Sequence, residues 1–232
     1  MSTLHSYYPP GVEIPDYVPN ELSTPSLLAI FATACTVVFS ATAFLAKSVN
    51  PRISDSELAK TLWFALCGSI HSILEGYYAL NFLTVASSLH PLAQLWKEYS
   101  LSDSRYLIPN SFVMPMESIT ALFWGPLSFV LVWFIITQHP LRHPLQIIIS
   151  LGQLYGDVLY YGTCAFEYVV NGNEFSRPEA YYFWGYFMLL NAFWIGIPGG
   201  LILDSVKAIR GAFVEVKGRR TAGVGGSSKK TL

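Results

Sequence analysis

The chain has 232 residues, of which 52% are hydrophobic and only 12% are charged, and its formal net charge is −1. Because a soluble domain carries about 25% charged residues, this composition is typical of an integral membrane protein. The near-neutral charge argues against nucleic acid as a partner. A chain of this length forms one bundle and leaves no room for a second, aqueous domain between its apolar segments.

Five apolar stretches are long enough to cross a bilayer as helices, which takes roughly 20 residues. They lie near residues 26–46, 61–83, 112–137, 145–169 and 181–205. We therefore predict an all-α integral membrane protein in which residues 26–206 form a five-transmembrane-helix bundle with an intramembrane cavity. Residues 1–25 precede this bundle, and a basic tail over residues 207–232 follows it. The Pro-Gly-Gly run at 198–200 is expected to bend or end the fifth helix.

The basic residues are distributed unevenly along the chain. Residues 1–25 contain no Lys or Arg, whereas half of the 14 basic residues lie in the tail. Since cytoplasmic connections carry the excess of basic residues, we predict a lumenal N-terminus and a cytosolic C-terminus. Lys229 and Lys230 match a di-lysine retrieval signal, which favours the endoplasmic reticulum membrane, with the nuclear envelope as a second candidate location. The alternative is a disordered Gly/Ser-rich basic tail.

His71, Glu75 and Glu117 are ionisable residues that lie inside the apolar stretches. Such a group at bilayer depth costs about 3 kcal/mol or more, so it is rarely present without a partner or a task. His71 and Glu75 are four positions apart and share one helical face. Glu117 and Thr120, three apart, also project to one side.

Asn191 and Trp194 repeat this spacing in the last apolar stretch. If the faces converge, the bundle encloses an apolar cavity with a few placed polar groups, which is typical of a ligand site. A structural alternative applies to all six residues. The acids and His71 could form interhelical hydrogen bonds, Thr120 and Asn191 could join helices, and Trp194 could be a packing residue.

Polar groups outside this set have structural explanations. Asp157 has Gln153 and two tyrosines at helical spacing, so a hydrogen-bonded structural role is at least as well supported as a catalytic one. Lys97, Asp103 and Arg105 lie in a polar connection, for which we predict a lumenal salt-bridged lid. Cysteines lack metal-site spacing, and no metal or cofactor is expected.

Two carboxyls and an imidazole in an apolar cavity suit proton transfer. Burial favours the neutral form of each group, so one can hold a proton while another accepts one. For an apolar substrate without a leaving group, this chemistry predicts a double-bond shift through a carbocation. Trp194 could stabilise the cation through its ring face, and exclusion of water would prevent its capture.

Several segments together resemble the emopamil-binding protein family, the 3β-hydroxysteroid Δ8,Δ7-isomerases. They are GSIHSILEGYYALNF, LWKEYSLSDSRY, MESITALFWGPLS, GQLYGDVLYY and YFWGYFMLLNAFWIGIPGGLILD, in this order over roughly residues 60–208. The resemblance implies a five-helix endoplasmic reticulum protein, often dimeric, that moves the sterol double bond from C8–C9 to C7–C8. It also implies that lipophilic amine drugs inhibit by imitating the carbocation, with sterol and membrane lipids as the other partners.

The resemblance also implies roles for the six residues. His71 with Glu75 would supply the proton at C9, and Glu117 would take the proton leaving C7, although the sequence leaves the donor and the acceptor open. Thr120 and Asn191 would orient the carboxyls, and Trp194 would face the cation. Two other functions remain open: an isomerase or cyclase of another isoprenoid, and a binding protein that holds sterols or cationic amphiphiles without turnover.

Overall fold

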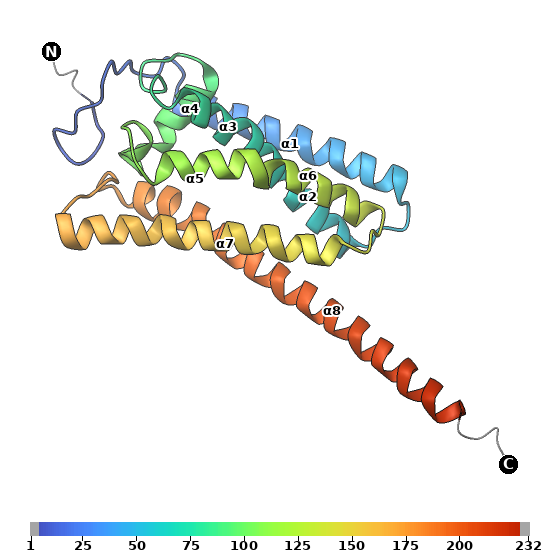
Figure 1. Ribbon diagram of the computed structural model, residues 1–232. Helices are drawn as coiled ribbons and strands as arrows, with labels where there is room; N and C mark the ends of the chain where they lie inside the picture. The colour runs from blue at the N-terminus through green and yellow to red at the C-terminus, as the bar shows by residue number, and fades with distance from the viewer. Residues whose placement is uncertain (1–4, 228–232) are drawn as a thin grey trace.

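The chain is helical and contains no β-strand in the part that the structure covers (Figure 1). The structure is a computed structural model that describes residues 5–227, with side chains up to residue 220. Three helices are long and apolar enough to cross a membrane: Thr24–Val49, Val113–Ile136 and Tyr181–Arg220. The predicted all-α class is therefore confirmed, and so is the presence of helices that can cross a membrane.

Five long helical rods follow one another along the described chain, and four of them contain a π-helical segment. The first is α1 (Thr24–Val49). The second joins α2 (Asp55–Ser69), the π-helical turn η1 (Ile70–Glu75) and α3 (Gly76–Asn81). The third joins α5 (Val113–Ile119), η3 (Thr120–Trp124) and α6 (Gly125–Ile136). The fourth joins α7 (Arg142–Phe166) and η4 (Glu167–Asn171), and the fifth joins η5 (Tyr181–Leu190) and α8 (Asn191–Ser227).

Side-chain caps mark where the first two rods begin. The Ser23 side chain accepts a hydrogen bond from the backbone N–H of Ser26, and Pro25 occupies the first turn, where no intrahelical donor is needed. Ser54 accepts in the same way from the N–H of Glu57, which also places an acidic side chain in the first turn. The second rod thus begins at a polar boundary before its apolar stretch.

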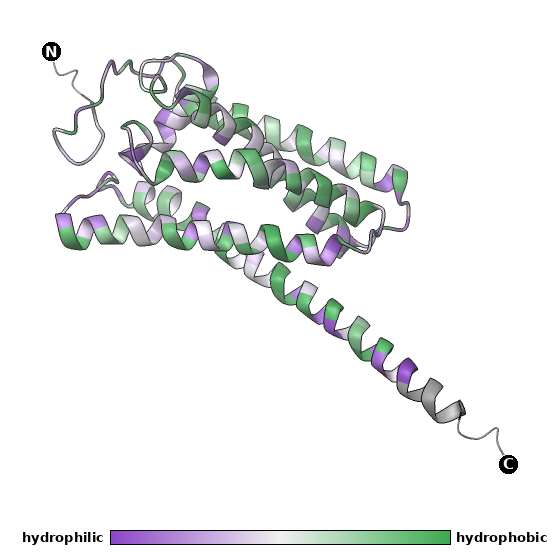
Figure 2. Ribbon diagram, in the orientation of Figure 1, coloured by the Kyte–Doolittle hydropathy of each residue, from purple (hydrophilic) through white to green (hydrophobic). Residues whose placement is uncertain are grey.

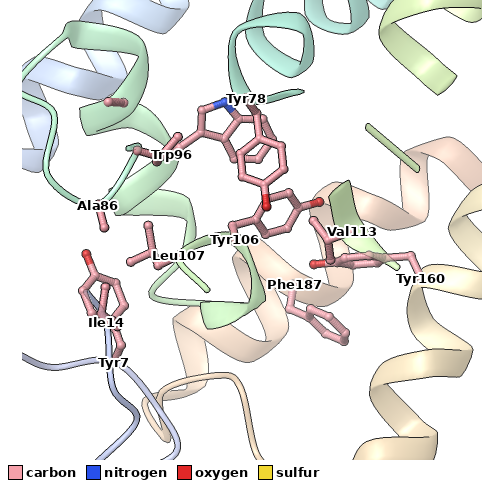
Figure 3. Packing of buried hydrophobic residues seen from close by; sticks show 12 residues of the cluster. Tyr7, Ile14, Tyr78, Ala86, Trp96, Tyr106, Leu107, Val113, Tyr160 and Phe187 are labelled. Atoms are coloured by element: carbon pink, nitrogen blue, oxygen red, sulfur yellow. The ribbon is translucent and has the colours of Figure 1, made fainter. Parts of the chain in front are cut away.

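The rods pack in a chain of neighbours: α1 lies on α2, α2 on α6, α6 on α7, and α7 against α8 (Figure 1). Fully buried aliphatic and aromatic side chains such as Phe64, Leu131 and Ile149 fill the junction of α2, α6 and α7. A second core, rich in aromatic rings, lies toward the other end of the bundle and includes Tyr78 and Tyr106 (Figure 3). In the second rod, His71 and Glu75 come between Phe64 and Tyr78, so the polar residues lie between the two cores.

Large apolar side chains remain exposed along the rods. The hydropathy colouring shows that hydrophobic residues are frequent along the rods of the bundle (Figure 2). Phe44 on α1, Leu80 on α3 and Val169 on η4 are examples, each more than two-thirds exposed. Soluble proteins rarely expose contiguous apolar surface on this scale. The outer surface therefore suits a lipid environment.

Two short helices lie in the connection between the second and third rods: α4 (Pro91–Tyr99) and the 3₁₀ turn η2 (Ser104–Tyr106). The N-terminal segment packs on this connection, because the Gln94 side chain accepts hydrogen bonds from the N–H groups of Glu21 and Leu22. The connection is thereby tied to the start of α1.

Of the two predicted effects of the run at 198–200, a bend or an end of the fifth helix, the end is contradicted by the structure. Helix α8 continues through Pro198 to Ser227 and projects away from the bundle (Figure 1). A proline removes one backbone donor, but ending the helix in apolar surroundings would leave several backbone groups unsatisfied. The backbone of residues 207–227 is helical rather than disordered, whereas Lys229 and Lys230 lie outside the described residues.

Candidate active site

His71 and Glu75 meet on one face of η1, as their spacing predicts. Nδ1 of His71 lies 2.7 Å from Oε2 of Glu75, and His71 is only 3% exposed. The turn is π-helical, since the N–H of Gly76 reaches the carbonyl of His71 five residues earlier. Both side chains are therefore held inside the bundle by a locally widened helix.

Thr120 joins the second rod to the third. Its hydroxyl donates to Oε2 of Glu75, the same oxygen that faces His71. The hydroxyl oxygen also lies 2.9 Å from the backbone carbonyl oxygen of Glu117. The prediction that Thr120 orients a carboxyl agrees with this geometry, and the carboxyl belongs to Glu75.

Glu117 is buried at the start of the third rod, with 3% of its surface exposed. The hydroxyl of Tyr106 donates to its Oε1 at 2.7 Å. Its Oε2 is buried and has no hydrogen-bond partner in the described chain. One carboxyl oxygen of Glu117 thus accepts a hydrogen bond from Tyr106, and the other accepts none from the described residues.

Gln153, on α7, contacts the far side of the imidazole. Its Nε2 lies 3.0 Å from Nε2 of His71, and both side chains are buried. If the amide nitrogen donates, His71 Nε2 accepts, and the imidazole proton is on Nδ1, directed at Glu75. The second, third and fourth rods therefore all contribute to one polar cluster.

Asn191 and Trp194 line the same space but do not join this cluster. The Asn191 carboxamide donates to the hydroxyl of Tyr99 at 3.0 Å and to the carbonyl of Phe187 at 2.7 Å. The expectation that Asn191 orients a carboxyl is therefore wrong, because its polar atoms are turned toward Tyr99. Trp194 packs against Trp63, with ring centroids 5.3 Å apart.

A cavity of about 750 Å³ lies among the rods, and its wall is mainly apolar. All six residues singled out from the sequence line it: His71, Glu75, Glu117, Thr120, Asn191 and Trp194. This volume is within the range of small-molecule sites, and the few polar groups are gathered on part of the wall. Within residues 5–227, no group of three or more His, Cys, Asp or Glu side chains is arranged to hold a metal ion.

An ion pair fixes the connection that carries Tyr106. Arg105 donates to both carboxylate oxygens of Asp103, and both side chains are almost completely buried. Burial lowers the pKa of Arg105, but the Asp103 carboxylate raises it further, and the net pKa lies above the ordinary value. The guanidinium also donates to Thr163 of α7 at 2.9 Å. The predicted salt bridge is confirmed for this pair.

Lys97 does not take part in that salt bridge. Its ammonium donates to the backbone carbonyls of Val18 and Ser88, at 2.7 and 2.8 Å. Burial lowers its pKa. Lys97 therefore ties the N-terminal segment to the connection through carbonyl groups instead of a carboxylate.

Sequence reasoning missed two contributors to the cluster, Tyr106 and Gln153. Gln153 could have been noticed as a polar residue inside an apolar stretch, but its spacing of four residues from Asp157 suggested that these two side chains pair with each other. That expectation is wrong, since Gln153 contacts His71, and Oδ2 of Asp157 is buried without a hydrogen-bond partner among the described residues. Tyr106 lies in a polar connection, where no pattern links it to Glu117.

Together, these features define a class: an all-helical, membrane-type protein with a hydrogen-bonded acid–base cluster in an apolar cavity. Residues 91–205 match the EXPERA (EXPanded EBP superfamily) family. The chain is 41% identical over 211 residues to the 3-beta-hydroxysteroid-Delta(8),Delta(7)-isomerase of Mus musculus, and the match covers 90% of both chains. It is 39% identical over 214 residues to the proteins of the same name from Cavia porcellus, with 90% coverage of both chains, and Rattus norvegicus, with 91%.

The chain belongs to the emopamil-binding protein (EBP) family. The resemblance found in its sequence segments is thereby confirmed.

Proposed function

We propose that this protein is a sterol isomerase that moves a double bond from C8–C9 to C7–C8. One observation carries the proposal: His71, Glu75 and Thr120 form a continuous hydrogen-bonded group, with Glu117 beside it, on the wall of an otherwise apolar cavity. A sterol offers no leaving group, so proton transfer is the chemistry that such a site can supply. The names of the relatives support the same reaction.

The proposed reaction begins with protonation of the double bond. The His71–Glu75 pair delivers a proton to C9, which leaves a carbocation at C8. Thr120 holds Glu75 Oε2 in place, and Gln153 holds the imidazole with its Nδ1 toward Glu75. Because these contacts come from three different rods, the donor pair is fixed before substrate arrives, which is the condition for efficient acid catalysis.

Loss of a proton from C7 completes the shift. The free Oε2 of Glu117 is the proposed acceptor, and Tyr106 stabilises the carboxylate through Oε1. One proton enters the sterol and one leaves it, so the reaction is balanced without an oxidant or a reductant. The opposite assignment of donor and acceptor predicts the same product.

The apolar wall is proposed to protect the cation. Trp194 lines the cavity, and an aromatic face near a positive charge stabilises it by about 0.5–2 kcal/mol. Exclusion of water prevents capture of the cation as an alcohol. Lipophilic amines are proposed inhibitors, because an ammonium among carboxyls and rings imitates the cation.

We further infer that all five rods cross the endoplasmic reticulum membrane, with the N-terminus lumenal and the C-terminus cytosolic. Rods two and four carry polar residues, but those polar side chains face the bundle interior, where other rods meet them. Membrane lipids would cover the exposed apolar faces. The homodimer expected from the family resemblance stays a prediction, to be tested by light scattering of the detergent-purified protein.

The test is expression of the chain in cells that lack sterol Δ8,Δ7-isomerase. Mass spectrometry would follow conversion of a Δ8 sterol to its Δ7 isomer. We expect conversion by the wild type and loss of conversion in His71→Ala, Glu75→Ala and Glu117→Ala, with Glu174→Gln in an exposed loop as the matched control. A wild type that accumulates in the membrane but converts no sterol would refute the proposal, and turnover of another isoprenoid would point to the alternative function.

A further inference from the structure

Asp157 is an acid on the cavity wall that the proposed reaction does not use. It lies on α7, one helical turn after Gln153, and lines the same cavity as His71 and Glu117. Its Oδ2 is buried and has no hydrogen-bond partner within residues 5–227. The sequence offers Tyr160 and Tyr161 as partners, but Tyr161 donates instead to the carbonyl of Met188 at 2.7 Å.

A buried polar oxygen without a partner is unfavourable, and native proteins satisfy nearly all such atoms. Among the acidic side chains on the cavity wall, Glu117 and Asp157 each keep one buried oxygen free. Glu117 has a role in the proposed proton transfer. Asp157 has none, so its free oxygen indicates a hydrogen-bond donor that arrives with the ligand.

We propose that Asp157 accepts a hydrogen bond from the hydroxyl group of a lipid alcohol, which is the 3-hydroxyl of the sterol. This inference rests on the proposed function. A sterol is hydrocarbon apart from this hydroxyl, so the substrate brings one polar donor into an apolar cavity. A neutral hydroxyl also loses less hydration on entry than an ammonium ion does.

The spacing along α7 fits this assignment. Residues four apart on an α-helix are separated by about 6 Å along its axis. Gln153 marks the level of His71, which it contacts, and Asp157 therefore lies about one turn away from the proton donor. In a sterol, the 3-hydroxyl and the C8–C9 bond lie at opposite sides of two fused six-membered rings, a comparable separation. Asp157 would thus fix which way the sterol enters and which ring meets His71.

The experiment compares two substrates in each protein variant. One substrate is a Δ8 sterol with a free 3-hydroxyl, and the other is its 3-deoxy analogue, which lacks the donor. We expect wild-type kcat/KM to favour the hydroxyl sterol by about ten- to a hundredfold. In Asp157→Leu, we expect this ratio to fall to near unity because turnover of the hydroxyl sterol drops. Asp157→Asn should keep most of the preference, because its amide oxygen still accepts.

Glu174→Gln is the control, since Glu174 is an exposed acid in the loop that follows η4. An Asp157→Leu protein that retains the wild-type preference would overturn the inference while leaving the isomerase proposal intact. A wild type that converts neither substrate would instead overturn the proposed function. If Asp157→Leu does not yield a monodisperse protein in detergent, Asp157→Ala provides the same comparison with a smaller side chain.

Discussion

Oε2 of Glu75 is within hydrogen-bond distance of both His71 and Thr120, whereas Oε2 of Glu117 has no hydrogen-bond partner in the part of the chain that the structure describes. The two carboxyls are therefore unequal: Glu75 is embedded in a network, and Glu117 keeps an open position. Pairs of acids whose surroundings differ in this way divide the tasks of proton donor and proton acceptor. Because of this asymmetry, we expect substitutions of Glu117 and of its partner Tyr106 to affect the proton-accepting step.

Glu117→Gln should lower kcat by about a hundredfold or more, because an amide cannot accept the proton from C7. The side-chain shape and the contact from Tyr106 are retained, so KM for sterol should change little. The same substitution should weaken competition by tamoxifen-like amines, since an amide cannot ionise to pair with the ammonium group. Steady-state kinetics with and without amine provide the test, and undiminished amine affinity would contradict the charge-mimic explanation.

Tyr106→Phe should reduce kcat by about tenfold without abolishing turnover, because it deletes one hydrogen bond to Glu117 and keeps the ring. The ring stacks on Trp96, with centroids 4.6 Å apart, so the fold should be preserved. Tyr161→Phe is the matched control, since that hydroxyl donates to a backbone carbonyl outside the cluster. Equal kinetic losses in both variants would argue against a special role for Tyr106.

At the residue scale, local spacing predicted part of the site. His71 and Glu75 meet because residues four apart share a helical face, and this holds in η1. The contacts of Gln153 with His71 and of Tyr106 with Glu117 could not be predicted in this way. The first joins residues 82 positions apart, and the second crosses a loop whose conformation depends on the buried Asp103–Arg105 ion pair.

At the scale of elements, the site depends on a close approach of the second and third rods. A Cβ atom at Gly125 would lie 2.3 Å from Oγ and 3.0 Å from the backbone nitrogen of Ser72. No side chain fits between the two backbones at that point. The absence of a side chain at Gly125 therefore lets η1 and α6 pack closely enough for Thr120 to reach Glu75.

Gly125→Ala should separate these rods and destabilise the protein by about 1–3 kcal/mol, as overpacking of a core does. Turnover should fall as well, because the Thr120–Glu75 contact would lengthen. Gly162→Ala on α7 is the control, since a Cβ there meets nothing within 4 Å. Thermal unfolding in detergent and sterol turnover measure both effects, and a Gly125→Ala protein as stable and active as Gly162→Ala would contradict this explanation.

A polar contact at the start of α2 predicts a pH effect. Glu57 lies 2.8 Å from Arg142 and accepts from Gln138. Burial raises its pKa, but these partners lower it more, and the net pKa lies below the ordinary value. A depressed carboxyl pKa adds stability above the unfolded value of about 4.3, and this contribution is lost as the pH falls through the folded pKa.

Glu57→Gln should therefore lower Tm at pH 7, and the difference from wild type should shrink as the pH approaches 4. Since the pair is partly exposed, the effect at pH 7 should be small, about 1 kcal/mol or less. Differential scanning fluorimetry across this range measures it. If the Tm difference between wild type and Glu57→Gln grew on acidification, the conclusion that the pKa of Glu57 is lowered in the folded protein would be wrong.

Helix positions were largely predictable from apolar length, whereas their interruptions were not. Three of the five predicted stretches fall within their rods, at 26–46, 145–169 and 181–205. The stretch 61–83 extends two residues beyond the second rod, and 112–137 extends one residue beyond each end of the third. Hydropathy does not distinguish π-helical from α-helical backbone, because both bury the same residues. The sequence pattern therefore could not predict the π-helical turns η1 and η3. The continuation of α8 beyond Pro198 depends on its apolar surroundings, which outweigh the local preference of proline.

At the scale of the whole molecule, the proposed orientation, with a lumenal N-terminus and a cytosolic C-terminus, can be tested by glycosylation. A glycosylation acceptor inserted at the N-terminus should be modified in microsomes, whereas one placed after residue 227 should not. The physical reason is that basic segments stay cytosolic, and the exposed end of α8 carries basic side chains such as Lys217 and Arg219. Modification of both acceptors, or of the C-terminal one alone, would contradict five crossings in this orientation.

The π-helical turns have a consequence for the rods as wholes. A π-helical bond spans five residues in place of four, so each such turn holds one residue more than the α-helix would. One residue corresponds to about 100° of rotation around the axis. Phe64, which precedes η1, packs in one core, and Tyr78, which follows it, packs in the other. His71 and Glu75 lie in the turn that holds this additional residue, between the part of the rod that packs in one core and the part that packs in the other, so one continuous rod contributes to both cores and to the acid–base cluster.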